Sequence, residues 1–246
     1  MVRVLKQRFW EIDFLRGLAI MMMIIFHFFY DLNYFGAERI NFRSGFWWIF
    51  GRMIITIFIL LVGISLTISY SRVKKRKTGW KLFKKYFLRG LKIFGWGLII
   101  TLITWVFLKR GFIIFGVLHF IGVSIILAYP FLKLRFWNVL LSIIFILIGI
   151  YIDNLVFNSY WLIWMGLKPY YLYTVDYMPI FPWFGVILFG LFLGNLLYPS
   201  GKRRFKMSNL FNFSFIKLFC FLGRNSLLIY LIHQPILVAI LYLFVL

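Results

Sequence analysis

The sequence is poor in acidic residues, in cysteine and in charge overall. Only 6 of its 246 residues are Asp or Glu, against 28 Lys and Arg, and charged residues make up 14% of the chain. Soluble domains carry about 25% charged residues, and disordered chains need low hydrophobicity. The composition therefore argues against both classes. The single cysteine, Cys220, allows no internal disulfide, cysteine metal site or redox pair.

Apolar residues take the place of the missing charge and form 63% of the chain. Most apolar stretches approach the length of about 20 residues that spans a bilayer core. They lie near residues 14–35, 46–70, 88–108, 112–132, 136–152, 179–199 and 216–245. Without water to bind backbone groups, such stretches form helices. The sequence thus predicts an all-α polytopic membrane bundle of about seven transmembrane helices, with residues 1–246 as one domain.

The basic residues gather in alternate connections between these stretches. One set consists of Arg3, Lys6 and Arg8, ten bases from Arg72 to Lys92, the pair Lys133 and Arg135, and four bases from Lys202 to Lys206. Basic loops stay in the cytoplasm. We therefore expect the N-terminus inside and the C-terminus outside. The net charge of +22 then points to anionic lipid, and a nucleic-acid partner is not expected.

A shorter apolar segment, residues 155–167, cannot cross the membrane. It contains Trp161 and Trp164 and precedes three tyrosines. Aromatic rings settle at the membrane interface, so we expect the segment to lie there, with a short re-entrant piece as the alternative.

Ionisable residues inside the predicted spans are the strongest functional signal, because such groups are costly in lipid and rarely face it. They are Arg16, His27, Asp31, Arg52, His119, Arg224 and His233. On the first span, Asp13, Arg16, His27 and Asp31 fall within about 60° of one another at the ideal helical period. Arg16 and His27 are separated by roughly 16 Å along the axis. This polar face must point into the bundle or a cavity.

His27 and Asp31 are four residues apart, and a carboxylate beside an imidazole can fix its tautomer and raise its basicity. Arg52, at the start of the second span, can stabilise charge or pair with Asp31. Structural alternatives stand beside these roles. Arg16 can snorkel to the headgroups and pair with Asp13, and a buried histidine is more often hydrogen-bonded than reactive.

Several motifs resemble membrane-bound acyltransferases. The opening Glu11-Ile-Asp13-Phe-Leu-Arg16-Gly17, with His27 eleven residues after the arginine, resembles their first span. The other motifs are Gly116-Val-Leu-His119, Asp176-Tyr-Met-Pro179, Gly223-Arg224-Asn225-Ser226 and His233-Gln234-Pro235. Together they resemble small membrane proteins related to the heparan-alpha-glucosaminide N-acetyltransferase catalytic domain. Assigning the active histidine to the first span follows the O-acyltransferase pattern, from which the N-acetyltransferase departs.

The resemblance implies transfer of an acetyl group from cytoplasmic acetyl-CoA to a sugar, amino sugar or glycolipid on the outer side. Acyl transfer needs a base and donors near the oxyanion. His27 is the expected base, oriented by Asp31, with Arg52 near the charge. Arg16, Arg89 and Lys92 are the expected donor-binding residues.

Three more residues complete the candidate site. His119 and His233 are candidates for a second base, an acetyl carrier or an acceptor ligand. Asp176 can bind an amine or hydroxyl of the acceptor, or can cap a helix that begins near Pro179. We expect no metal.

Three other functions stay open. A proton-coupled transporter would use the same buried groups. A haem-binding electron carrier would use two of the three histidines, and a scaffold would use the polar face only for packing. The bilayer is a partner in every case, and a homodimer is compatible with so small a bundle. In a prokaryote, the location would be the plasma membrane.

Overall fold

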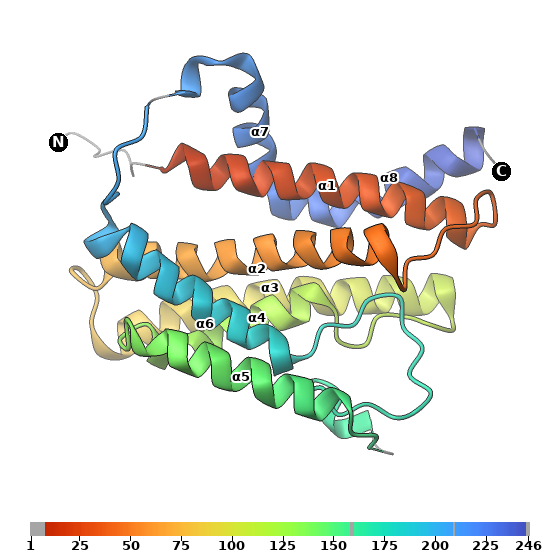
Figure 1. Ribbon diagram of the computed structural model, residues 1–246, viewed down its shortest axis with the longest axis horizontal. Coiled ribbons are helices and arrows are strands. Elements are labelled where there is room, and N and C mark those ends of the chain that lie inside the picture. Colours follow the sequence, from red (N-terminus) through yellow and green to blue (C-terminus); the bar gives the residue numbers. More distant parts are fainter. Residues whose placement is uncertain (1–7, 158–159, 209, 245–246) are drawn as a thin grey trace. The chain divides into compact units, whose positions relative to one another are not determined.

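The computed structural model describes residues 8–157, 160–208 and 210–244. The chain folds into helices joined by short connections (Figure 1). The α-helices are α1 Trp10–Tyr34, α2 Gly45–Val73, α3 Gly79–Leu108, α4 Val117–Phe131, α5 Trp137–Asp153, α6 Ile180–Leu197, α7 Ser214–Arg224 and α8 Ser226–Phe244. Three single-turn 3-10 helices lie at Tyr160–Leu162, Pro199–Gly201 and Leu210–Asn212. Arg3, Lys6 and the end of the last predicted span at residue 245 lie outside the described residues.

The all-α membrane fold predicted from the sequence is confirmed. In the described ranges, five helices are long and apolar enough to cross a bilayer, namely α1, α2, α3, α6 and α8. The apolar helices α4 and α5 are shorter, with 15 and 17 residues. Each of these seven helices overlaps one predicted stretch. The number of crossings and the orientation stay predictions.

The segment expected to be a basic loop is largely helical. The span predicted at 88–108 begins nine residues earlier, because α3 starts at Gly79 and runs for 30 residues. The turn between α2 and α3 is therefore confined to residues 74–78. Lys and Arg are good helix formers, so the basic residues after Gly79 continue the helix instead of ending it.

The last predicted span, 216–245, is two helices. Helix α7 ends at Arg224, and α8 begins at Ser226. The break falls at Asn225, whose side-chain amide donates to the carbonyl of Phe221 at 2.9 Å. Asn side chains compete in this way with the backbone ladder and disfavour helix interiors. The polar motif inside the apolar run thus marks a helix boundary that hydropathy alone does not reveal.

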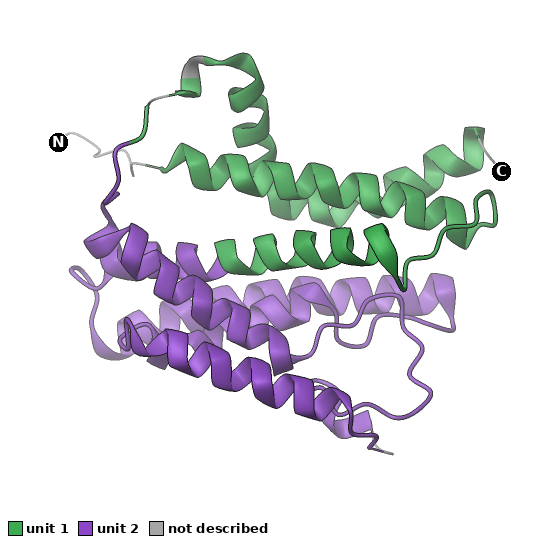
Figure 2. Ribbon diagram, viewed as in Figure 1, with its two compact units in different colours: residues 1–61, 207–246 green, residues 62–206 purple. Residues whose placement is uncertain are grey.

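The chain divides into two compact units (Figure 2). Unit 1 comprises residues 1–61 and 207–246, and unit 2 comprises residues 62–206. Unit 1 therefore holds α1, the first part of α2, α7 and α8. Its apolar core contains Ile20, Met23 and Ile54, with Phe26 and Ile229 packed against it. Whether residues 1–246 act as one domain stays a prediction.

Glycines let the helices of each unit meet at backbone distance. In unit 1, a Cβ added to Gly17 of α1 would overlap the carbonyl oxygen of Phe219 in α7, and one on Gly223 would overlap that of Asp13. In unit 2, Gly90 of α3 faces Gly122 of α4, and Gly63 of α2 faces α6. Small residues at helix contacts are typical of membrane bundles, where close packing replaces the hydrophobic effect.

We expect Gly17→Val to destabilise the protein by about 1–3 kcal/mol, the usual cost of overpacking a filled contact. The added atoms have no room against the α7 backbone. Thermal unfolding in detergent measures the effect. Gly95→Ala is the control, because a Cβ built there meets no described atom within 4 Å beyond its chain neighbours and the nearby backbone of its own helix, and alanine favours the helix. An unchanged melting temperature for Gly17→Val would contradict this packing.

Candidate functional site

In unit 1, α8 brings two polar side chains to the polar face of α1. The imidazole rings of His27 and His233 lie 5.0 Å apart between centroids, tilted by 54°. Beside them, the amide nitrogen of Gln234 donates to Oδ1 of Asp31 at 2.7 Å. We call His27, Asp31, His233 and Gln234 the histidine cluster. It joins residues some 200 positions apart in the sequence.

Every member of the histidine cluster has a buried polar atom with no hydrogen-bond partner among the described residues. These atoms are His27 Nδ1, Asp31 Oδ2, His233 Nε2 and Gln234 Oε1. Buried polar atoms are nearly always paired, and each unpaired group costs about 1–3 kcal/mol. Four such atoms on the packed helices α1 and α8 make the histidine cluster the candidate functional site.

The hydrogen bond of His233 indicates its tautomer. Its Nδ1 lies 2.7 Å from the carbonyl oxygen of Tyr230. A carbonyl can only accept, so Nδ1 carries the hydrogen in this contact. In the neutral ring, Nε2 then holds the lone pair, and this is the buried atom that has no partner within the described residues. His233 is thus oriented as a proton acceptor, with a backbone carbonyl fixing its ring.

His119, in unit 2, has the opposite character. Its Nδ1 accepts from the backbone N–H of Gly116 at 3.3 Å, and its Nε2 lies 3.3 Å from the hydroxyl of Thr101. That hydroxyl donates to the carbonyl of Ile113 at 2.7 Å, which leaves it to accept from Nε2–H. Both ring nitrogens are therefore paired. These bonds account for the burial of His119 by structure alone.

Asp31 contacts a different residue from the one expected. The sequence predicts that it orients His27 or pairs with Arg52, whereas its hydrogen bond among the described residues goes to Gln234. The guanidinium of Arg52 lies over the ring of Trp48, 4.4 Å from its centroid. Sequence spacing identifies neighbours on one helix, but the partner on α8 is set by tertiary packing.

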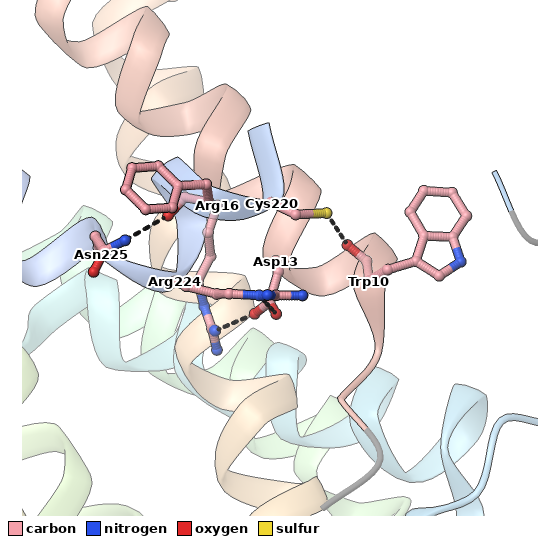
Figure 3. Close-up of polar contacts among 7 residues, drawn as sticks. Trp10, Asp13, Arg16, Cys220, Arg224 and Asn225 are labelled. Carbon is pink, nitrogen blue, oxygen red and sulfur yellow. Dashed lines mark hydrogen bonds and ion pairs between the residues drawn. The ribbon is translucent and has the colours of Figure 1, made fainter. Parts of the chain in front are cut away.

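A second polar group lies at the start of α1 (Figure 3). Asp13 Oδ1 accepts from Arg16 at 3.3 Å, and Asp13 Oδ2 accepts from Arg224 of α7 at 3.3 Å. The thiol of Cys220 donates to the carbonyl of Trp10 at 3.3 Å. These contacts tie α7 to α1 beside the Gly17 packing. Arg16, expected to bind the donor, is thus engaged with Asp13, the structural alternative that the sequence also allows.

The remaining expected residues lie in unit 2. Arg89 and Lys92 are exposed on α3. Asp176 accepts from the backbone N–H of Val117 at 2.9 Å and so satisfies the first turn of α4. The helix that Asp176 could alternatively cap, beginning near Pro179, has Pro179 itself at the N-cap position. The alternative structural role of Asp176 is therefore realised on α4, because the loop folds back to that helix. Among the described residues, no group of three His, Cys, Asp or Glu could hold a metal ion.

Two members of these polar groups had no assigned role at the level of sequence. Gln234 orders Asp31, and Arg224 shares Asp13 with Arg16. The sequence feature that could have identified Gln234 and Arg224 is a polar side chain within an otherwise apolar stretch. Gln234 directly follows His233, and Arg224 lies in the motif that separates α7 from α8.

We expect the charge of Asp176 to make stability depend on pH. Burial raises the pKa of its carboxyl above the usual value, and the hydrogen bond from Val117 opposes this. The unfolded chain therefore ionises first, and stability falls as pH rises from about 3.8 through the raised pKa. Thermal unfolding between pH 4 and pH 7 would show a smaller fall for Asp176→Asn than for the native chain. Parallel curves would exclude this contribution.

Comparison with known proteins agrees with the family resemblance of the sequence motifs. A family model described as heparan-alpha-glucosaminide N-acetyltransferase, catalytic, matches residues 8–235. No curated protein and no solved structure matches the chain. The matched range covers all the polar groups described above and most of the chain. The chain therefore belongs to the heparan-alpha-glucosaminide N-acetyltransferase catalytic family.

Proposed function

We propose that the protein transfers an acetyl group from acetyl-CoA to a hydroxyl or amine of a sugar, amino sugar or glycolipid. Membership of a membrane acetyltransferase family supports the reaction class and does not favour the transporter alternative. The observation that carries the site is the histidine cluster, with its four unpaired polar atoms in one place. The expected topology gives the donor cytoplasmic access and the acceptor outer access.

The cluster contains the groups that acyl transfer requires. The acceptor oxygen or nitrogen attacks the thioester carbonyl while an imidazole nitrogen takes its proton. The tetrahedral intermediate then collapses, the carbon–sulfur bond breaks, and the imidazolium returns its proton to the leaving sulfur, so that CoA departs as the thiol. His27 is the base expected from the sequence, and His233 presents a lone pair on Nε2. The two rings lie 5.0 Å apart between centroids, so both can reach one bound acceptor group.

The other two side chains suit acceptor binding. Oδ2 of Asp31 and Oε1 of Gln234 are both hydrogen-bond acceptors without partners in the described ranges. Sugar hydroxyls and amines carry the donors that match them. The Gln234–Asp31 hydrogen bond fixes both groups, so they present their acceptors in a fixed geometry. We assign no step to Arg52 or His119, because their contacts explain them structurally.

We expect acetyl-CoA to stabilise the purified protein. A ligand at about 100 times its dissociation constant adds roughly 2.7 kcal/mol to the free energy of unfolding. Thermal unfolding in detergent would be compared with acetyl-CoA, CoA and ATP. A shift with the first two and none with ATP supports the proposal. No shift at millimolar acetyl-CoA argues against it.

We expect His27→Ala and His233→Ala each to lower acetyl transfer by about 10²–10⁴-fold, the usual contribution of a general acid or base. The assay follows labelled acetyl from acetyl-CoA to a panel of glucosaminide acceptors in proteoliposomes. Ile25→Ala, at an exposed position on the same helix, is the control and should retain activity. Full activity in both histidine variants would show that neither His27 nor His233 is required for acetyl transfer.

A further inference from the structure

Unit 2 contains a cavity of about 600 Å³ at the helix ends that are expected to face the cytoplasm. It lies where α2, α6 and the connection from α4 to α5 meet. Ligand pockets in proteins have volumes of about 300–1,000 Å³, so the cavity has the size of a small-molecule site. None of the residues proposed above for acetyl transfer lines it.

The lining is cationic. Lys74, Lys133 and Arg135 stand around the cavity, and no carboxylate lines it. Among the described residues, none of these three bases forms an ion pair. The ammonium of Lys74 lies 5.5 Å from the ring centroid of Tyr70, which also lines the cavity. Three uncompensated cations around one hollow attract an anion.

The inner wall adds hydrogen-bond donors to these charges. Ser71 is buried, and Tyr70, Asn195 and Ser200 also line the cavity. Hydroxyl and amide groups beside lysine and arginine are the partners that phosphate oxygens accept from. A carboxylate ligand would use fewer of them, because it has only two oxygens.

The backbone at the cavity is strained. Arg135 and Ser200 have φ angles of +43° and +54°. Non-glycine residues adopt this region uncommonly, at a cost of about 1–3 kcal/mol each, and such residues gather at ligand sites. Both residues line this cavity. The strained backbone therefore lies at the same cavity as the basic side chains and the hydrogen-bond donors.

We propose that this cavity binds a phosphate-bearing ligand, either the nucleotide end of CoA or the headgroup of an anionic phospholipid. If the phosphate comes from CoA (the CoA source), the inference rests on the proposed function. If it comes from a phospholipid (the lipid source), the inference is independent of that function. If CoA is the ligand, its phosphates are held here and not by Arg16, Arg89 or Lys92.

The test uses the full chain with Lys133→Gln and Arg135→Gln combined. Lys77→Gln is the matched control, because Lys77 is exposed three residues after Lys74 and does not line the cavity. One arm measures the dissociation constant of acetyl-CoA in neutral detergent. The other measures phosphatidylglycerol retained against phosphatidylcholine after purification from mixed nanodiscs. Loss of charge-assisted contacts weakens binding by about tenfold per side chain.

Weaker acetyl-CoA binding in the double variant, with Lys77→Gln unchanged, supports the CoA source. Unchanged acetyl-CoA binding with at least a twofold loss of retained phosphatidylglycerol supports the lipid source. No change in either arm overturns the inference. If the native chain binds no acetyl-CoA, the proposed function fails, and the lipid arm alone then decides what the cavity binds.

Discussion

The absence of water in a bilayer core is the constraint on which this structure depends. Every backbone N–H and C=O must find its partner within the protein, so the apolar stretches form helices. Because lipid is as apolar as leucine, helices gain little by hiding apolar surface from it. The glycines at Gly17, Gly63, Gly90 and Gly223 provide the alternative, which is direct contact between backbones.

The lack of water in the bilayer core also constrains the polar side chains, because they too need hydrogen-bond partners within the protein. The ring nitrogens of a histidine buried inside a membrane protein need hydrogen-bond partners, which come either from the protein or from a bound ligand. His119 is paired through both nitrogens with Thr101 and Gly116. His27 and His233 each keep a buried nitrogen without a hydrogen-bond partner in the part of the chain that the structure describes. Histidines that look alike in the sequence therefore separate into one whose ring nitrogens are both hydrogen-bonded and two that we propose for acetyl transfer.

Hydropathy and helical period predicted the membrane class, the approximate helices and the polar face of α1, because these depend only on local composition. The break at Asn225 and the early start of α3 depend on side-chain hydrogen bonding and helix propensity, which hydropathy does not measure. The pairing of Asp31 with Gln234 and the capping of α4 by Asp176 depend on which helices pack together. No spacing within one segment contains that information.

The length of α3 affects how the protein sits in its membrane. At about 1.5 Å per residue, its 30 residues measure roughly 45 Å, against a hydrocarbon core of about 30 Å. The surplus is the basic first part, and its lysines and arginines are fixed to a rigid rod. In a thicker bilayer, the same rod would have to draw those charges toward the acyl chains. If α3 crosses the bilayer, we therefore expect its position along the membrane normal to depend on bilayer thickness.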